Sequence, residues 1–405
     1  MDIFKVAHIY ADAGTSQLGF GKRWNHVLAV GDGKGSSALA DASSEGCPRL
    51  TKAIADLEGH EIPSVDLIYA NVPGAAFSIA NHVKREASSD LSALAHLARL
   101  VREKARVGEC PALAVAESVV GLASGQGVRE LQQYAAQLVE AGYRFGGVEL
   151  QALPFVPQSR SRLFLVAVRN DIDASQFCSA EPVAHVHGTT LRRAVSELPA
   201  AVAKNHLWLT LPPLPADGPD LSSIIDYDVD EFDSLELTAK YLAMMAPRNR
   251  YRLEQVFSAD PVAAGAFCQR TREEPSGKVQ RIEVRFDHAG CVRTAGGGSS
   301  RQKVFLKKDG QLRSRLFTRI ELARLMGLPD DFLNGRTYTQ ACLIAGQGSV
   351  PPVLRYLGTH LLEPLLQNSR RGLSNRSNDT TRHVLENIPS LEFDGHPIEF
   401  AEERT

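Results

Sequence analysis

Short apolar segments alternate with helical patterns along the first 185 residues of the chain. Apolar runs typical of strands lie at residues 4–11, 26–31, 66–71, 111–117 and 163–168. Between the later runs, residues 89–106 and 128–141 repeat apolar side chains at helical spacing. Parallel strands need crossover connections, usually helices, which then cover both faces of the sheet. The alternation therefore predicts an α/β fold with a doubly wound, mostly parallel sheet over residues 1–185.

The turns that follow these strands are expected to line one cleft. Ligands in doubly wound sheets bind at the carboxyl ends of the strands, where such turns meet. Gly14 and Gly19 lie in the first turn, as in loops whose backbone approaches a ligand closely. Ordinary turn glycines of a strand–turn–helix unit would give the same pattern. The turns are residues 12–19, 31–33, 71–78 and 117–121.

The pattern changes after residue 185, and residues 186–315 are expected to form a separate, smaller and irregular domain. This region holds a proline-rich stretch at 211–220, an acidic run at 224–233 and a glycine–serine loop at 296–300. Clustered arginines predict a binding surface of its own, although a solvated face would look the same. They are Arg248, Arg250, Arg252, Arg270, Arg272, Arg281 and Arg285.

Residues 316–366 are expected to return to the first domain. Thr318 and Glu321 have the spacing of a capping box, and Gly327 is placed to end the helix that they begin. Residues 353–366 predict a last amphipathic helix, interrupted near Pro364. Residues 367–405 are expected to be a tail, which begins with a polar stretch of low apolar content.

Composition limits the classes of partner and metal site. The formal net charge is −2, so any nucleic-acid surface must come from local clustering of arginine and lysine. The six cysteines show neither a CxxC pair nor a Cys/His ligand spacing, so no metal site is expected. Scattered cysteines, and the lack of a run long enough to span a membrane, predict a soluble cytoplasmic protein.

Four segments, in order, resemble the C5-cytosine DNA methyltransferases. They are PFVPQSRSRLFLVAV (154–168), RIEVRFDHAGCVRTAGGGSSRQ (281–302), RLFTRIELARLMGLPDDF (315–332) and AGQGSVPPVLRYLGTHLLEPLL (345–366). The resemblance implies the fold of S-adenosylmethionine-dependent methyltransferases with a smaller target-recognition domain. It also implies S-adenosylmethionine as cofactor and double-stranded DNA as partner, with no metal and no membrane.

The resemblance also implies site residues. Glu117, Arg160 and Arg162 match the catalytic positions. The cofactor positions are Tyr10, Gly14, Gly19, Asp32, Pro73, Ser349 and Val350. The expected DNA contacts are Gln158, Arg270, Arg272, Arg285, Gly297, Ser299, Arg301 and Gln302.

The sequence departs from the family pattern where the chemistry takes place. Gly74 stands at the position of the nucleophilic cysteine, whose thiolate adds to C6 of cytosine. Asp12 and Thr15 replace glycines of the cofactor loop, and Gly31 replaces the acidic residue that holds the ribose hydroxyls. These changes predict a weakened cofactor site. At Gly74 they predict a small void that could hold a flipped base without attacking it.

Three functions fit these features. The first is a catalytically deficient homologue that binds DNA, regulates a partner methyltransferase, or does both. The second is an active cytosine methyltransferase, or a related base modifier, that uses non-standard residues. The third is an interaction or scaffold protein without a DNA role, which the acidic run at 224–233 leaves room for.

Overall fold

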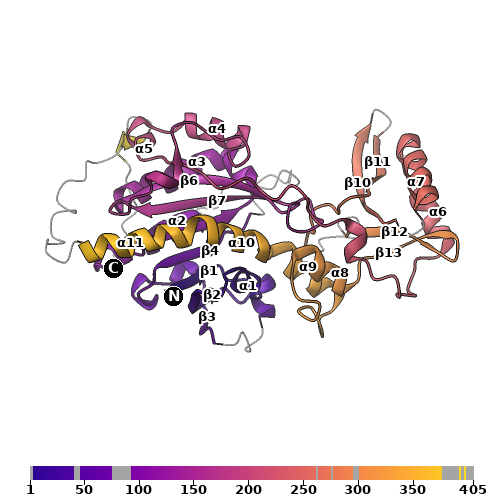
Figure 1. The fold of residues 1–405 in the computed structure, drawn as a ribbon, viewed down its shortest axis with the longest axis horizontal. Coiled ribbons are helices and arrows are strands. Elements are labelled where there is room, and N and C mark those ends of the chain that lie inside the picture. The colour runs from indigo at the N-terminus through magenta and orange to yellow at the C-terminus, as the bar shows by residue number, and fades with distance from the viewer. Residues whose placement is uncertain are drawn as a thin grey trace.

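The computed structural model describes residues 3–40, 46–74, 93–260, 263–274, 277–294 and 301–375, together with 392–393 and 396–397. They form two lobes of unequal size, joined beside the helices α8 (Arg319–Met326) and α9 (Tyr338–Gln347) (Figure 1). The chain begins in the large lobe, enters the small lobe and returns to the large one. Both sequence segments that were expected to build the first domain therefore meet in space.

A seven-stranded sheet in the order β3-β2-β1-β4-β5-β7-β6 forms the centre of the large lobe. The first five strands pair in parallel, and β7 runs antiparallel to β5 and β6. The predicted doubly wound, mostly parallel sheet is therefore confirmed. Its strands are β1 (Phe4–Ile9), β2 (Trp24–Gly31), β3 (Arg49–Thr51), β4 (Leu67–Asn71), β5 (Leu113–Ser118), β6 (Tyr143–Gln151) and β7 (Ser161–Arg169).

β6 is a strand that the apolar pattern did not reveal. Gly146 and Gly147 interrupt its apolar run, and glycines inside a strand mark a close approach of other atoms. A Cβ at Gly146 would lie 2.3 Å from the carbonyl oxygen of Leu207. The glycine thus lets the segment that contains β9 (Trp208–Leu209) pack directly on β6.

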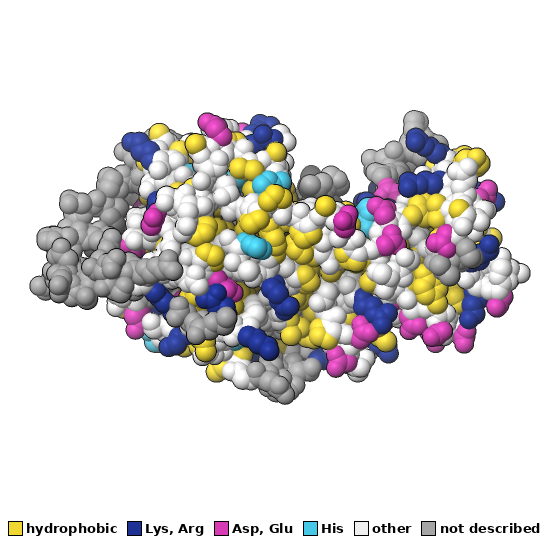
Figure 2. All heavy atoms as spheres, viewed as in Figure 1, with side chains coloured by type: hydrophobic (Ala, Val, Ile, Leu, Met, Phe, Trp, Pro, Cys, Tyr) yellow, Lys and Arg dark blue, Asp and Glu magenta, His cyan; other side chains and the backbone are white. Residues whose placement is uncertain are grey.

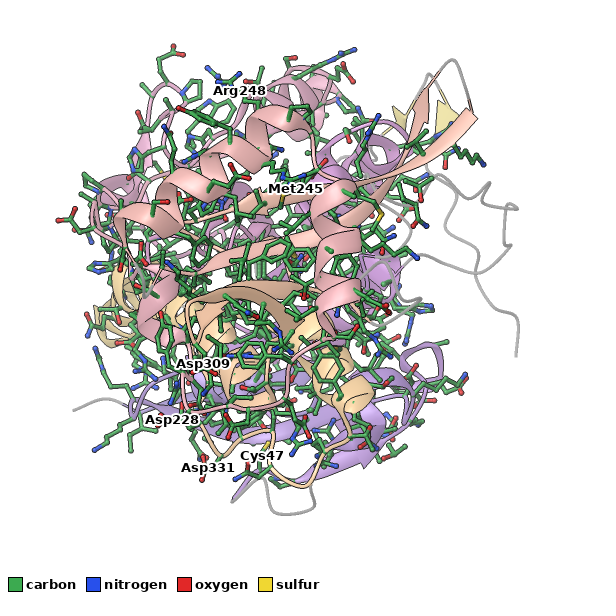
Figure 3. The ribbon with its side chains drawn as sticks, turned by 90° about the vertical axis from the view of Figure 1, so that its right-hand side faces the viewer. Cys47, Asp228, Met245, Arg248, Asp309 and Asp331 are labelled. Atoms are coloured by element: carbon green, nitrogen blue, oxygen red, sulfur yellow. The ribbon has the colours of Figure 1, made fainter. Side chains whose placement is uncertain are left out.

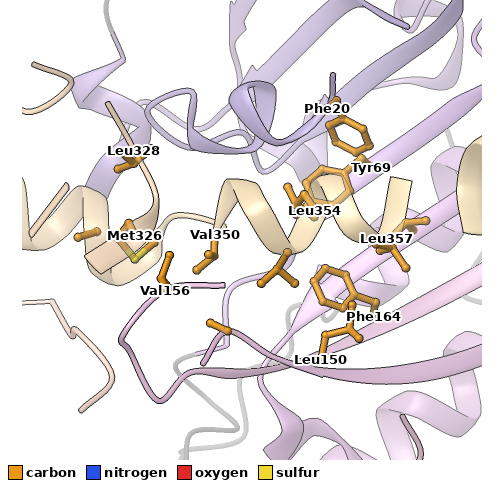
Figure 4. Close-up of a cluster of buried hydrophobic side chains, with 14 of the residues drawn as sticks. Phe20, Tyr69, Leu150, Val156, Phe164, Met326, Leu328, Val350, Leu354 and Leu357 are labelled. Carbon is orange, nitrogen blue, oxygen red and sulfur yellow. The ribbon is translucent and has the colours of Figure 1, made fainter. Parts of the chain in front are cut away.

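Helices cover both faces of the sheet. On one face, α2 (Ala93–Arg106) and α3 (Gln126–Glu140) bury leucines against β1, β4 and β5. On the other face, α1 (Thr15–Gly19) and α10 (Pro351–Leu357) pack against the sheet. Figure 4 shows this second layer, in which Leu354 and Leu357 of α10 face the rings of the cluster around Tyr69 and Phe164.

The small lobe has a core of its own. Its antiparallel sheet has the order β11-β10-β12-β13 and packs against α6 (Leu235–Ala243) and α7 (Pro247–Ala259). Phe267 and Phe305 stack at its centre with ring centroids 4.1 Å apart. Figure 3 looks onto this lobe, with α6 and α7 in front of the sheet. The strands are β10 (Gly265–Glu274), β11 (Gly277–Arg285), β12 (Lys303–Lys308) and β13 (Gln311–Leu316).

Residues 186–225, which the sequence pattern grouped with the second domain, bury their apolar side chains with those of the large lobe. α4 (Thr189–Ser196) and α5 (Ala200–Ala203) belong to the same cluster as α2 and α3. Leu209, Leu211 and Leu221 belong to the cluster on the opposite face. The proline-rich stretch therefore runs along the large lobe before the chain enters the small one.

The C-terminal segment begins with α8, whose predicted caps are both present. Thr318 and Glu321 form the capping box, and Gly327 ends the helix in the left-handed region at φ 68°. Farther on, α10 passes through a π-helical turn at Gly358–Leu362 into α11 (Glu363–Asn375). Pro364 follows this turn. Proline has no N–H to donate to the carbonyl of the preceding turn, and its ring would collide with that carbonyl. The wider π-helical turn gives the ring room.

The predicted polar tail is helical in its first part, which corrects the expectation for residues 367–375. Arg370 docks α11 on the first strand: its guanidinium lies 4.6 Å from the Phe4 ring centroid and donates to the Ile3 carbonyl at 2.9 Å. Asn368 donates to the Asp173 carbonyl at 2.9 Å. This segment is ordered despite its low apolar content because its polar side chains bind backbone carbonyls next to β1 and after β7.

Two side chains from the segment just before β7 hold the lobes and the C-terminal segment together. The amide of Gln158 donates to the Leu325 carbonyl at 2.6 Å and accepts from the Val292 N–H at 2.9 Å. Arg160 is 2% exposed. Its guanidinium donates to backbone carbonyls on both sides, those of Val292, Ala345, Gly346 and Gly348, at 2.6–3.4 Å.

Replacing Arg160 by lysine should therefore destabilise the fold, because an ammonium group cannot reproduce the planar fork of donors. Buried carbonyls left without a donor cost about 1–3 kcal/mol each, so we expect a loss of about 3 kcal/mol or more. Arg162→Lys, two residues along the same strand, should cost less than about 1 kcal/mol because its guanidinium is partly exposed. Equal losses in chemical denaturation would contradict the anchoring role of Arg160.

Candidate functional site

The carboxyl ends of β1, β2, β4 and β5 meet at one edge of the sheet, as the sequence predicted. Asp12 follows β1, Gly31 ends β2, Gly74 follows β4, and Glu117 lies at the end of β5. The junction between α9 and α10 adds Ser349 to the same place, through its bond to the Tyr69 hydroxyl at 2.9 Å. A site at this edge is therefore assembled from segments that lie far apart in the sequence.

The carboxylate of Asp12 lies inside the turn between β1 and α1. Its Oδ1 accepts from the backbone N–H groups of Gly14 at 2.8 Å and Thr15 at 2.9 Å. Its Oδ2 accepts from the Thr15 hydroxyl at 2.5 Å. More distant donors to the same oxygen are the Asn71 amide and the Ser349 N–H, both at 3.4 Å. Asp12 is only 3% exposed, so the turn uses its own side chain to satisfy its donors.

The Glu117 carboxylate is also engaged by the protein. The Tyr69 hydroxyl donates to Oε2, and the Arg162 guanidinium lies 3.6 Å from Oε1. Both Tyr69 and Glu117 are buried. Burial, followed by the negative charge of Glu117, raises the pKa of Tyr69 well above its usual value, so the hydroxyl keeps its proton. Tyr69 therefore occupies one oxygen of the carboxylate that was expected to meet a cytosine ring.

The backbone at Gly74 has no room for the side chain of a nucleophile. A Cβ there would lie 2.8 Å from Cγ1 and 3.1 Å from Cγ2 of Val119. Valine is branched at Cβ and stiff, so it cannot move aside cheaply. The predicted void at Gly74 is absent, because Val119 fills the space beside the glycine.

The position of the expected acidic residue after β2 is closed in a similar way. A Cβ at Gly31 would lie 2.0 Å from the Ser37 hydroxyl oxygen. The neighbouring Asp32 is exposed, and its carboxylate accepts from the Lys34 N–H at 2.9 Å. Asp32 therefore shapes its own turn in this structure.

The other predicted cofactor residues have varied surroundings. Tyr10 adopts a left-handed backbone at φ 54°, and Gly14 does so at φ 100°. Gly19 lies against α10, where a Cβ would come within 2.6 Å of Leu354. Pro73 is exposed beside Gly74, while Val350 is part of the core under α10.

Some of the predicted DNA-contacting residues are internal. Gln158 is fully buried and binds backbone, as described above, which differs from the expected DNA contact. Gln302 is 7% exposed and packs on Gly290. Arg301 lies with its guanidinium 5.5 Å from the Tyr338 ring centroid. Gly297 and Ser299 lie outside the described residues, as does the side chain of Arg272.

On β10 and β11 the arginines share one face of a hairpin. Arg270 lies opposite Arg281, and Arg285 lies opposite Ala266, so all three arginines point to the same side. Arg270 is paired with Glu283 at 2.9 Å. Residues on the other face, including Phe267 and Val284, belong to the core of the small lobe or pack against it.

Sequence reasoning missed several residues of this site. Tyr69 and Arg49 belong to no quoted motif. Val119 lies in the turn at 117–121 and Gln347 in the motif at 345–366, but neither was given a role, and only their contacts reveal them. Cys291 was also overlooked, although it lies within the motif at 281–302. Its Sγ is 3.8 Å from the Arg160 guanidinium. Burial opposes ionisation, but Arg160 and the other nearby arginines outweigh it and lower the pKa of the thiol.

The described ranges lack two further kinds of feature. These residues contain no group of three or more histidine, cysteine, aspartate or glutamate side chains that could hold a metal ion. None of the helices in the described part of the chain is long and apolar enough to cross a membrane.

Known proteins share both the sequence pattern and the fold. The Type II methyltransferase M.HhaI of Haemophilus parahaemolyticus is 25% identical over 304 residues, 74% of this chain and 76% of the relative. M.FnuDI of Fusobacterium nucleatum is 22% identical over 330 residues, 81% and 85% of the two chains. The S. pombe Dnmt2 methyltransferase structure has a TM-score of 0.57 at 15% identity, covering 90% of this chain and 99% of that one.

The structure of the Entamoeba histolytica methyltransferase EhMeth gives a TM-score of 0.53 at 12% identity, with the same coverage of 90% and 99%. These structural likenesses confirm the methyltransferase fold. The family model of C-5 cytosine-specific DNA methylases matches residues 44–363, which leaves the turn that holds Asp12 outside the match. That range is well over half of the chain, and the chain therefore belongs to the C-5 cytosine-specific DNA methylase family.

Proposed function

We propose that this member of the family binds double-stranded DNA without methylating it, alone or beside an active methyltransferase. The observation that carries the proposal is the packing of Val119 against Gly74. Cytosine C5 becomes nucleophilic only after a thiolate adds to C6, and glycine has no group for that step. Loss of a covalent nucleophile costs several orders of magnitude in rate.

The state of Glu117 supports the same proposal. A carboxylate that assists attack on a cytosine must be available to the ring, yet Tyr69 donates to one of its oxygens and Arg162 lies beside the other. Both partners come from the large lobe itself. Glu117 and Arg162, two of the three groups that the family resemblance assigns to catalysis, therefore lie beside each other.

The small lobe supports the DNA-binding part of the proposal. Among the described side chains of one hairpin face, three arginines, Arg270, Arg281 and Arg285, lie with one carboxylate, Glu283, so these side chains carry more positive than negative charge. Figure 2 shows a notch in the outline between this hairpin and the large lobe. Figure 3 shows Arg248 of α7 toward one side of the view and Asp228, Asp309 and Asp331 toward the other. A polyanion would be drawn to the arginine-bearing face of the hairpin.

The first test is methyl transfer from labelled S-adenosylmethionine to duplex DNA of mixed sequence by the pure protein. We expect no incorporation above a protein-free control, while an active relative assayed in parallel incorporates label. Incorporation that Glu117→Ala abolishes would overturn the proposal. A Cys291→Ser arm shows whether any such activity uses the thiol beside Arg160.

The packing at Gly74 gives a second prediction. Gly74→Cys should lower the free energy of unfolding by about 1–3 kcal/mol, because the new Cβ overlaps Val119. Val119→Ala removes the obstructing methyl groups, so the double variant should be more stable than the sum of the two single changes predicts. Additive losses in a double-mutant cycle would show that the two residues do not meet as described.

DNA binding should weaken steeply with salt, since phosphate contacts release counterions. In gel shifts on duplex DNA, Arg285→Ala should reduce the slope of log affinity against log salt by about 1 if it contacts one phosphate. Arg193→Ala is the control, because Arg193 is an exposed residue of α4 in the large lobe and pairs with Glu197. Absence of binding, or equal effects of the two changes, would count against the proposed surface.

A further inference from the structure

Two backbone donors of the turn after β1 are already bonded to a carboxylate of the chain itself. S-adenosylmethionine carries an amino-acid carboxylate, which needs N–H donors and the absence of nearby negative charge. The N–H groups of Gly14 and Thr15 both point to Asp12, within 2.9 Å of its Oδ1. A second carboxylate here would lose these donors and meet a buried like charge, which is costly in a poorly solvated place.

The side that would meet the ribose also lacks its binding group. Ser37 leaves no space for any side chain at position 31. Asp32 is exposed and bonded to its own turn at Lys34. Gly31 therefore offers no side chain to the ribose hydroxyls, and Asp32 already uses a carboxylate oxygen within its own turn.

Side chains bridge the mouth of the cleft from strand to strand. Arg49 of β3 donates to the carbonyl of Asp12 at 2.6 Å and to that of Ala11 at 3.3 Å. Gln347 lies at the end of α9. Its side-chain oxygen accepts from the Ser36 N–H at 2.7 Å, and its backbone carbonyl accepts from the Asn71 side-chain amide at 3.0 Å. These bonds connect the ends of β1, β3 and β4 with α9 and the turn after β2.

Tyr69 is buried beneath the same strand ends. Its ring packs among Phe20 and His8, with centroids 5.3 and 5.8 Å away. Its hydroxyl joins Glu117 to the Ser349 hydroxyl, and the Ser349 N–H donates to the Thr15 hydroxyl at 2.9 Å. One connected set of hydrogen bonds thus runs from Glu117 through Tyr69 and Ser349 to Thr15 and Asp12.

We propose that Asp12 and Tyr69 take the place of the cofactor in this chain, so that the cleft is closed by its own hydrogen bonds and does not take up S-adenosylmethionine. The residues present do not fit the cofactor that the family resemblance implies. Asp12 acts as an internal replacement for the ligand's carboxylate. The proposed function concerns the missing nucleophile and the binding of DNA. The present inference adds that the large lobe is stable without a bound ligand.

The direct test titrates the full chain with S-adenosylmethionine and, separately, with S-adenosylhomocysteine. Calorimetry should detect no saturable heat, and neither compound should raise Tm, at concentrations that saturate an active relative used as positive control. Saturable binding of either compound to the unmodified chain would overturn the inference. The readout does not depend on activity, because a binding-competent cofactor stabilises the native state whether or not it reacts.

A second measurement tests Asp12 itself. Asp12→Ala should lower Tm by roughly 2 °C or more, because two backbone donors and the Thr15 hydroxyl lose their acceptor. Asp12→Asn keeps one oxygen for the backbone donors and should lower Tm less, which provides a readable variant if the alanine change prevents folding. Asp32→Ala, at the exposed turn after the next strand, is the matched control and should leave Tm nearly unchanged.

The outcomes separate this inference from the proposed function. An unchanged Tm in Asp12→Ala, or a loss equal to that of Asp32→Ala, would overturn the internal replacement. Binding of S-adenosylhomocysteine without methyl transfer would overturn the inference and leave the DNA-binding proposal intact. Absence of DNA binding together with absence of cofactor binding would overturn the proposed function and support the closed cleft.

Discussion

The buried guanidinium of Arg160 is the interaction on which the arrangement of the cleft depends. It binds carbonyls at the junction of α9 and α10 and in the segment around Val292, so it fixes where the C-terminal segment returns to the sheet. Burial lowers the pKa of Arg160 to about 10, which still leaves the group charged and donating at neutral pH. Only with this junction held can Ser349 and Gln347 reach the turns after β1, β2 and β4.

Once the junction is in place, the buried polar groups at these strand ends are hydrogen-bonded by the chain itself. Buried polar groups are costly unless they are bonded, and here their partners are side chains of the chain itself. Asp12 binds the turn, and Tyr69 binds the Glu117 carboxylate. Val119 fills the space next to Gly74. Val119 and Tyr69 thus occupy the surroundings of Gly74 and Glu117 with contacts made by the chain itself.

The small lobe is stabilised by an apolar core of its own. Its core of stacked and aliphatic side chains supports a hairpin whose outer face is free to carry charge, because cross-strand neighbours alternate between the core and solvent. The net charge of the chain is −2, yet Arg270, Arg281 and Arg285 share this face. The proposed DNA binding therefore depends on the local distribution of charge rather than on the overall charge.

The sequence by itself determined the doubly wound sheet, the capping box of α8 and the departure at Gly74, because periodicity, capping and residue identity are local properties. It did not reveal β6, whose glycines serve a packing contact with the Leu207 segment, nor the order of residues 367–375, where Arg370 binds the first strand. It predicted a void at Gly74 and a weakened cofactor site at Asp12. Only the tertiary structure decided that Val119 fills the first place, because that contact joins residues far apart in the sequence. The Asp12 carboxylate is bonded within its own turn, by Gly14 and Thr15, but its contacts with Asn71 and Ser349 also depend on the tertiary structure.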